Sequence, residues 1–150
     1  MSKATSALSL REITKETAKP VLALKVAEGQ ENLVGDNGNS IALAHFEEKA
    51  WFRGIYAGDE PVGFMMLSID REKPEFYLWR FMIAEAHQGK GYGKRAMELL
   101  MDYLRDELEA EELVLHVMDL PHSARAFYEA LGFTWTGEVD GDELVMSRPL

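Results

Sequence analysis

Hydrophobic residues in the first half of the chain form short runs separated by polar turns, a pattern typical of β-strands. The runs cover residues 8–13, 51–57, 62–69 and 77–83. The sequence Gly-Asp-Glu-Pro at 58–61 is typical of a hairpin turn, and residues 70–74 form the next turn. The last three runs therefore predict antiparallel strands that follow one another directly.

Two helices are predicted between the first and second of these runs. Thr14 and Thr17 are candidate N-caps, while Pro20 favours a helix that begins near residue 19 and ends before residue 29. Residues 28–39 are polar and rich in glycine, so we expect a loop that forms a lid or a wall of a binding site. Asn39 or Ser40 then caps a helix that runs to about residue 49.

The second half of the chain opens with an amphipathic helix directly after residue 93. Its apolar residues at helical spacing are expected to fill the core rather than to bind a cofactor: Met97, Leu100, Met101, Leu104 and Leu108. Residues 111–118 predict a strand, 123–131 a short helix and 133–136 a strand. A turn at Asp140-Gly141 leads to a last strand that runs through residue 146.

Composition indicates one domain over residues 1–150, because 150 residues with 47% hydrophobic content suffice for one core. With no cysteine, the chain has no disulfide, no catalytic thiolate and no zinc site built on cysteine. The four histidines, at 45, 87, 116 and 122, lack metal-ligand spacing. We therefore expect no bound metal.

Charge and hydropathy bear on partners and location. A net charge of −10 disfavours nucleic-acid binding, which needs a basic face, and slightly favours a cationic ligand. No apolar run is long enough to span a bilayer, and the first residues lack a signal-peptide pattern. We expect a cytoplasmic protein that binds neither membranes nor nucleic acid.

The loop at residues 88–93, Gln-Gly-Lys-Gly-Tyr-Gly, lies between the strand ending at Ile83 and the long helix. Its glycines, Gly89, Gly91 and Gly93, allow backbone N–H groups to converge on a phosphate. The N-terminus of the helix adds unpaired N–H groups and the positive end of its dipole. Lys90, Lys94 and Arg95 add positive charge, so the loop predicts an anion cradle.

Other phosphate loops have different spacing. A nucleoside triphosphatase loop needs four residues between its first glycine and a Gly-Lys pair, followed by Ser or Thr. Here three residues separate Gly89 from Gly93-Lys94, and Arg95 follows. A dinucleotide fingerprint needs a third glycine where Lys94 stands. Both of these readings are disfavoured.

The pattern Gln88-x-x-Gly91-x-Gly93, between strand and helix, resembles the acetyl-coenzyme A signature of the GNAT superfamily of N-acetyltransferases. The segment Ala124-x-x-Phe127-Tyr128-Glu129-x-x-Gly132-Phe133 is similar to the final helix and strand of that family. Residues 79–83 (Trp-Arg-Phe-Met-Ile), Leu24-x-Val26 and Gln30-x-x-Leu33-Val34-x-x-Asn37-x-x-Ser40 look like bacterial spermine, spermidine and diamine acetyltransferases. The loop motif is the most specific of these.

The resemblance implies an α/β fold with a central, mostly antiparallel, splayed mixed sheet of about seven strands and about four helices on its two faces. It also implies acetyl-coenzyme A as co-substrate. The cofactor-binding residues would be Phe81, Met82, Ile83, Gln88, Gly89, Lys90, Gly91, Tyr92, Gly93 and Lys94. In this scheme a backbone N–H near Phe81 polarises the thioester carbonyl, and Met82 and Ile83 pair with the pantetheine arm, provided that their strand splays from residues 113–117.

Tyr128 is the expected catalytic acid that protonates the leaving thiolate, since a phenol stays protonated at neutral pH. From the residues alone, its helix face favours a packed core aromatic, and the resemblance is what favours the acid role. The family often has asparagine seven residues before this tyrosine, where this chain has Pro121. That departure leaves the cofactor contact there in question, with His122 or Ser123 as substitutes.

The acceptor site rests on less specific residues. Glu28 and Glu31 are candidates to receive the positive charges of a polyamine, and Tyr77 and Trp79 to form an aromatic wall for an ammonium group. Strand alternation places Arg80 opposite Trp79, where its charge needs an acidic partner. The general base stays open between a carboxylate and a chain of waters.

The expected function is transfer of acetyl to a primary amine of a small cationic molecule, a polyamine or a diamine, by direct attack in a ternary complex. Acetylation of a peptide N-terminus, a lysine or an aminoglycoside is the alternative enzymatic function. An acyl-coenzyme A sensor without turnover is the non-enzymatic one, and Pro121 gives it some support. The resemblance also suggests a homodimer.

Overall fold

The computed structural model describes residues 7–25, 37–120 and 123–150. Seven strands form a single sheet in the order β1-β2-β3-β4-β5-β7-β6. The strands are β1 Leu8–Arg11, β2 Ala50–Ala57, β3 Glu60–Asp70, β4 Glu75–Ile83, β5 Glu112–Met118, β6 Thr134–Asp140 and β7 Glu143–Pro149. The helices are α1 Ala18–Leu22, α2 Asn37–His45, α3 Tyr92–Leu108 and α4 Arg125–Ala130, with a short 3₁₀ turn, η2, at Glu85–His87.

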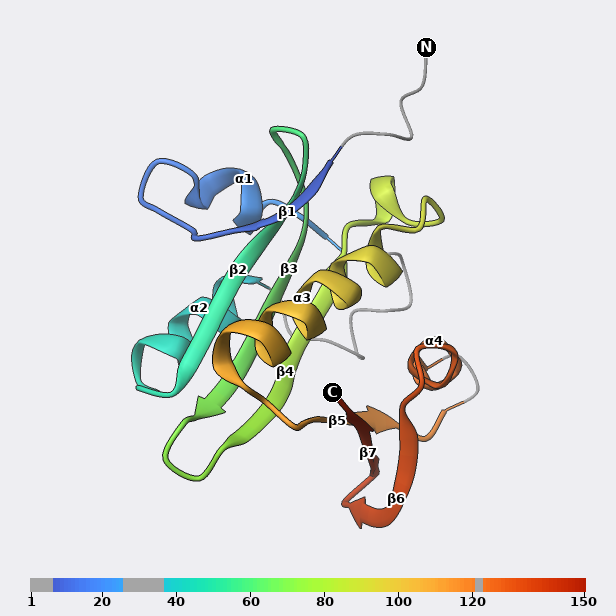
Figure 1. The fold of residues 1–150 in the computed structure, drawn as a ribbon. Helices are drawn as coiled ribbons and strands as arrows, with labels where there is room; N and C mark the ends of the chain where they lie inside the picture. The colour runs from blue at the N-terminus through green and yellow to red at the C-terminus, as the bar shows by residue number, and fades with distance from the viewer. Residues whose placement is uncertain (1–6, 26–36, 121–122) are drawn as a thin grey trace.

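The sheet consists of two parts that meet along a very short seam. Strands β1 to β4 pair antiparallel in sequence order, and β5, β7 and β6 form a second antiparallel group. The parallel pair β4 and β5 joins them through two register positions only, Tyr77 with Val114 and Leu78 with Leu115. Figure 1 shows the two groups diverging beyond this seam. The mixed, mostly antiparallel, splayed sheet of the sequence prediction is confirmed.

The larger part of the core lies between the sheet and α3, which crosses in front of β3 and β4 in Figure 1. The helix buries Ala96, Met97, Leu100, Met101 and Leu104 along one stripe, as its apolar periodicity predicted. The alternate residues Leu113, Leu115 and Val117 of β5 point to this same core, as do Tyr128 of α4 and Phe133. We call this side of the sheet the α3 face.

The opposite side of the sheet, here the α1 face, carries a second and smaller apolar cluster. Val21 of α1 is buried there against Tyr56, Phe64, Met66, Met82 and Ala84, and residues of α2 pack at its edge. Asn37 is also buried, and its Nδ2 donates to the carbonyl oxygen of Val21 at 2.7 Å. This hydrogen bond joins the start of α2 to the end of α1.

Several predicted boundaries need correction. Helix α2 begins at Asn37 rather than after an Asn39 or Ser40 cap, and it ends at His45 instead of near residue 49. The hairpin between β2 and β3 turns on residues 58–59 alone, because Ala57 pairs with Glu60. Strand β6 continues to Asp140, because Asp140 pairs with Glu143 of β7 across a turn at residues 141–142, and β7 continues to Pro149, because Pro149 pairs with Glu112 of β5. The predicted loop at 28–39 falls largely outside the described residues.

A bulge in β4 changes which side chains share a face. Met66 of β3 pairs with Arg80 but Leu67 pairs with Leu78, so Trp79 is the extra residue. Phe76 and Leu78 pack on the α3 face before the bulge, and Phe81 and Ile83 do so after it. The predicted opposition of Trp79 and Arg80 is therefore wrong: the guanidinium carbon of Arg80 lies over the Trp79 ring, 5.7 Å from its centroid.

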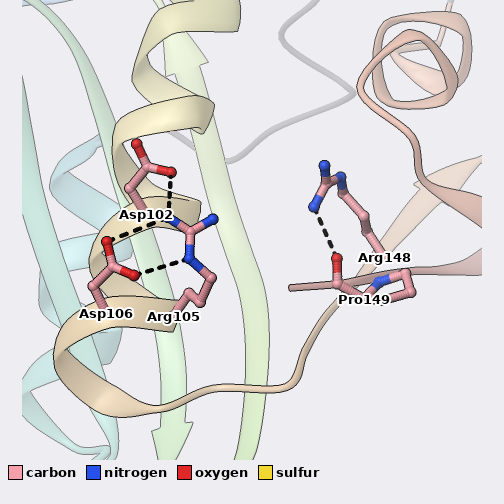
Figure 2. A network of polar contacts seen from close by, with 5 residues as sticks. All are labelled: Asp102, Arg105, Asp106, Arg148 and Pro149. Atoms are coloured by element: carbon pink, nitrogen blue, oxygen red, sulfur yellow. Dashed lines mark hydrogen bonds and ion pairs between the residues drawn. The ribbon is translucent and has the colours of Figure 1, made fainter.

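The C-terminal part is held together by polar contacts to backbone carbonyls. Nε of Arg148 donates to the carbonyl oxygen of Leu131 at the end of α4, at 2.8 Å, next to Gly132 with φ +98°. Figure 2 shows the second contact of Arg148, to Pro149, together with the exposed pairs of Arg105 with Asp102 and Asp106 on α3.

Within the described ranges, no helix combines the length and apolarity needed to cross a membrane.

Candidate active site

A cavity of about 610 Å³ opens where β4 and β5 separate. Its walls come from β4, the loop at 87–94, the end of β5, α4 and Glu143 of β7. Tyr77, Trp79, Phe81, Met82, Ile83 and Tyr128 line it, and so do all the predicted loop residues from Gln88 to Lys94 except Lys90. The structure thus brings the loop, the strand before it and Tyr128 around one space. We call the gap between β4 and β5 beyond Leu78 and Leu115 the slot.

Two of the three loop glycines take the backbone geometry that the sequence suggested. Gly89 has φ +79° and Gly91, the N-cap of α3, has φ +81°. A Cβ atom at either residue would meet nothing within 4 Å, so the loop is open on that side. Residues with a side chain rarely adopt such positive φ values, which explains why both positions are glycine.

Gly93 differs from this expectation, because it lies within α3 and its φ is not positive. A Cβ atom there would come within 3.3 Å of Cζ of Phe127 on α4. Absence of a side chain at residue 93 therefore lets the first turn of α3 approach α4 closely. The glycine serves packing rather than loop geometry.

The loop is tied to the end of β4 by hydrogen bonds. Nε2 of Gln88 donates to the carbonyl oxygen of Ile83 at 2.8 Å. The backbone N–H of His87 donates to the carbonyl oxygen of Ala84 through the η2 turn. These contacts set the position of the glycines relative to the slot.

Positive charge gathers around the same loop. Lys90, Lys94 and Arg95 are exposed, and none lies within ion-pair distance of a carboxylate among the residues that the structure describes. The N-terminus of the 17-residue helix α3 points its unpaired N–H groups to the same place. We call residues 88–93 with the first turn of α3 the cradle, and its charge and geometry suit a phosphate group.

The slot provides the separation of β4 from β5 that was required for Met82 and Ile83 to pair with a pantetheine arm. Among the described strands, residues 79–83 of β4 have no partner on the β5 side, since the ladder ends at Leu78 and Leu115. These residues border the cavity together with residues 116–118, and the carbonyls of Trp79 and Ile83 accept hydrogen bonds from Arg80 and Gln88. Phe81 stacks on Phe127 with ring centroids 6.0 Å apart, and Met82 is buried toward the α1 face.

Tyr128 lies on the α3 side of the cavity. Its ring makes edge contacts with Phe127, at 5.1 Å between centroids, and with Phe133, at 5.7 Å. The side chain is buried, and this burial raises the pKa of the phenol well above its ordinary value of about 10. Tyr128 therefore keeps its proton at neutral pH.

Arg80 lines the cavity at the point where the slot begins. One guanidinium nitrogen donates to the carbonyl oxygen of Trp79 at 3.1 Å, while Nε is buried with no hydrogen-bond partner. The expected acidic partner is not found: among the described residues, no carboxylate lies within 4 Å of this guanidinium. The ring of Trp79 and a backbone carbonyl support the charge instead.

A polar group lies at the inner end of the slot, and of its members only Tyr77 was predicted as a site residue. Its members, which we call the His116 cluster, are Tyr77, His116, Asp140 and Glu143. His116 makes an edge contact with the ring of Tyr77 at 5.0 Å, and its Nδ1 lies 3.6 Å from Asp140 and 3.9 Å from Glu143. Burial, with the charge of Glu143 nearby, raises the pKa of Tyr77, and the charge of Arg80 opposes this shift.

The sequence contained one signal for this cluster. His116 stands between Leu115 and Val117 in a strand whose odd-numbered residues are apolar, so strand alternation predicts its polar side chain on the opposite face. Its partners in β4 and β7 are far away in sequence, so only the sheet order reveals them. In the described part of the chain, no group of His, Asp or Glu side chains is arranged to hold a metal ion.

Some residues that the sequence singled out lie outside the described residues. They are Glu28 and Glu31, the candidate acceptor-binding acids, Pro121, at the family's asparagine position, and His122, one of its candidate substitutes.

Comparison with known proteins shows which family and fold this chain shares. The spermine/spermidine N(1)-acetyltransferase of Bacillus subtilis is 26% identical over 95% of this chain and 99% of its own length. A chimera built on the spermidine N-acetyltransferase SpeG of Vibrio cholerae superposes with a TM-score of 0.73 at 20% identity, over 95% of this chain and 94% of the other. A PaiA N-acetyltransferase from Thermoplasma acidophilum, in complex with coenzyme A, gives 0.60 at 22% identity over 75% and 68%.

A model of the acetyltransferase (GNAT) family matches residues 14–133, which include the slot, the cradle and Tyr128. The solved structures share the fold, and the relative from Bacillus subtilis is related over nearly the whole chain. The chain therefore belongs to the GNAT family and is an N-acetyltransferase.

Proposed function

We propose that the protein transfers acetyl from acetyl-coenzyme A to a primary amine of a small cationic acceptor, a polyamine or a diamine, within a ternary complex. The observation that carries this proposal is the continuity of the cavity from the cradle, along the slot, to Tyr128 and the His116 cluster. A donor held at one end and an acceptor at the other can meet there without a covalent enzyme intermediate.

The described residues fit coenzyme A. The cradle offers a pyrophosphate two glycines at positive φ, open space beside them and three cations that pair with no carboxylate of the described residues. The unpaired edge of β4 offers backbone groups of residues 79–83 to the amide groups of a pantetheine arm, much as one strand pairs with another. When bound, acetyl-coenzyme A supplies the acetyl group as an activated thioester.

Two groups of this chain would act on that thioester. A backbone N–H of β4 at or near Phe81 donates to the carbonyl oxygen and stabilises the negative charge that develops on it, an effect worth about 3–4 kcal/mol in comparable sites. The Tyr128 hydroxyl donates its proton to the leaving sulfur. The raised pKa of this phenol keeps Tyr128 protonated at neutral pH, so the proton is present when the sulfur leaves.

Three features support a small cationic acceptor. The relative from Bacillus subtilis is named for spermine and spermidine and aligns over nearly all of this chain. Asp140 and Glu143 place negative charge at the inner end of the slot, and the protein as a whole carries −10. Tyr77 and Trp79 border the cavity with aromatic faces that attract an ammonium group.

The test is an acceptor panel read by thiol release from acetyl-coenzyme A. It contains spermine, spermidine, putrescine, a lysine peptide, a peptide with a free N-terminus and an aminoglycoside. Saturable turnover with the polyamines or the diamine is the expected result. Turnover confined to peptides or to the aminoglycoside would exclude the proposed acceptor class, and cofactor binding without turnover on any amine would identify an acyl-coenzyme A sensor.

A further inference from the structure

His116 and Tyr128 line the same cavity from opposite sides of the sheet. Tyr128 packs in the core on the α3 face. Leu115 and Val117 point to that same core, so strand alternation directs His116 between them to the α1 face. The slot passes between β4 and β5 where their pairing stops, one residue before His116. A reacting carbonyl in the slot would thus have a phenol on one side and an imidazole on the other.

The surroundings of His116 orient its imidazole. Nδ1 is the nitrogen that lies within 4 Å of both Asp140 and Glu143. Nε2 has no hydrogen-bond or ion-pair partner in the described parts of the chain. Carboxylates beside one imidazole nitrogen favour a proton on that nitrogen, so the other nitrogen carries a free lone pair that can accept a proton.

We propose that His116 is the proton acceptor for the amine substrate, with Asp140 and Glu143 as its positioning residues. This inference rests on the proposed acetyltransfer to an amine. It completes a division in which the donor is handled on the α3 face and the acceptor on the α1 face of the sheet.

The protons balance as follows. The substrate ammonium gives one proton to Nε2 of His116, and the freed lone pair forms the C–N bond to the acetyl carbon while the C–S bond breaks. The sulfur takes the proton of Tyr128, and the newly acylated nitrogen loses its extra proton to restore the Tyr128 phenol. The proton on His116 is then released to solvent.

The other charged or titratable groups around His116 suit this role less well. Asp140 and Glu143 have side chains that are 72% and 44% exposed, against 21% for His116, so water solvates them more. Tyr77 holds its proton more tightly than an ordinary phenol, since its pKa is raised. Arg80, across the slot on β4, is a cation and cannot accept a proton.

His87 is the other histidine that lines the cavity, but it belongs to the cradle end. Its Nε2 lies 3.5 Å from Glu60 and its ring lies near Tyr92. It is therefore oriented toward the β2–β3 turn and the start of α3 and away from the inner end of the slot.

The experiment compares His116→Gln with the matched control His45→Gln, an exposed histidine on α2 away from the cavity. Thiol release is measured with the best polyamine or diamine acceptor between about pH 6 and pH 10. We expect His116→Gln to lower kcat about 10²–10⁴-fold at pH 7. The kcat should recover as the pH approaches the pKa of an alkylammonium, about 10.4, because the amine then loses its proton to water. Affinity for coenzyme A by calorimetry should not change, and His45→Gln should match the wild type.

A second variant tests the same proposal if glutamine at 116 prevents folding. Removing a carboxylate beside the imidazole in Glu143→Gln should lower kcat at pH 7, with the same recovery at high pH and with cofactor affinity unchanged. Unchanged kcat in either variant, or a loss that is equal at every pH, would overturn the assignment. If the wild-type protein is inactive with every amine, the proposed function itself is excluded, and this outcome differs from a failure of the His116 assignment alone.

Discussion

The two ends of the cavity are built in different ways. The cradle is a run of six consecutive residues followed by the first turn of α3, and its geometry follows from local glycine conformations and one side-chain hydrogen bond to Ile83. The His116 cluster draws on β4, β5, β6 and β7, which come together only through the sheet order. The difference teaches that a binding site for a fixed donor can be local in sequence, whereas the acceptor side depends on the assembled sheet.

The seam between β4 and β5 connects these two ends. Two register positions join the halves of the sheet, and the slot starts immediately beyond them. The bulge at Trp79 lies at the same point, where it turns Arg80 over the Trp79 ring at the inner end of the slot. A bulge at the point where pairing ends re-aims side chains into the cavity, as bulges often do beside active sites.

The sharpest separation of chemistry from binding comes from Tyr128→Phe. This change removes the hydroxyl and keeps the ring contacts with Phe127 and Phe133, so we expect kcat to fall by about 10²–10³ with coenzyme A affinity nearly unchanged. Steady-state kinetics and calorimetry measure the two effects. Tyr103→Phe, on α3 away from the cavity, is the matched control. Unaltered turnover would mean that Tyr128 serves packing alone.

Gly91→Ala in the cradle should weaken cofactor binding and leave kcat nearly unchanged, the reverse of Tyr128→Phe. A Cβ atom at φ +81° costs about 1–2 kcal/mol, even though nothing lies within 4 Å of it, so the loop backbone must shift. We expect coenzyme A to bind about tenfold more weakly, with kcat at saturation little affected. Gly58→Ala, at φ +61° in the β2–β3 turn with similarly open space, should lose comparable stability but no cofactor affinity. Equal affinity in both variants would contradict a role for the cradle in binding.

Burial of the Tyr128 phenol beside the slot predicts that the folded protein becomes less stable at alkaline pH. The pKa of Tyr128 is raised in the folded protein, so its stabilising effect is complete below the unfolded value of about 10 and is lost as pH rises above it. The free energy of unfolding should fall by about 1.4 kcal/mol per pH unit above pH 10 from this group alone. Urea unfolding of the wild type and Tyr128→Phe measures this, and parallel curves for the two would be evidence against a buried, protonated phenol.

The smallest expected effect concerns the free cations of the cradle. Replacing Lys90 and Lys94 together by glutamine should weaken coenzyme A binding a few-fold at low salt, about 0.3–1 kcal/mol for each exposed charge. The salt dependence of binding should fall with it, as titrations at two ionic strengths will reveal. Lys15→Gln, exposed between β1 and α1, controls for the change in net charge. An identical effect in this control would show that only the net charge matters.

Much of the fold was predictable because its signals are local. The strand runs at 51–57, 62–69 and 77–83 and the apolar stripe of the helix after the cradle each correspond to an observed element. The bulge was not predictable, since Trp79 and Arg80 follow the same alternation as their neighbours in sequence. It arises from pairing with β3, and it reverses the predicted relation of those two side chains.

In the candidate site, too, the locally encoded features were predictable and the features that depend on distant segments were not. Spacing in residues 88–93 predicted the cradle and excluded other phosphate loops, and Gly89 and Gly91 have the expected positive φ values. Gly93 proved to be a packing position against Phe127. His116 stood in the sequence as a polar residue in an apolar strand, yet its partners Asp140 and Glu143 are more than twenty residues away along the chain.

The sequence by itself determined the anion cradle and the identity of its flanking elements, because glycine conformation, helix polarity and apolar periodicity act over a few consecutive residues. Only the tertiary structure decided that β4 and β5 part after two register positions, that Tyr128 and His116 face one slot from opposite sides, and that Arg80 lies on Trp79. These features depend on strand order and register, which distant segments settle together when they pack.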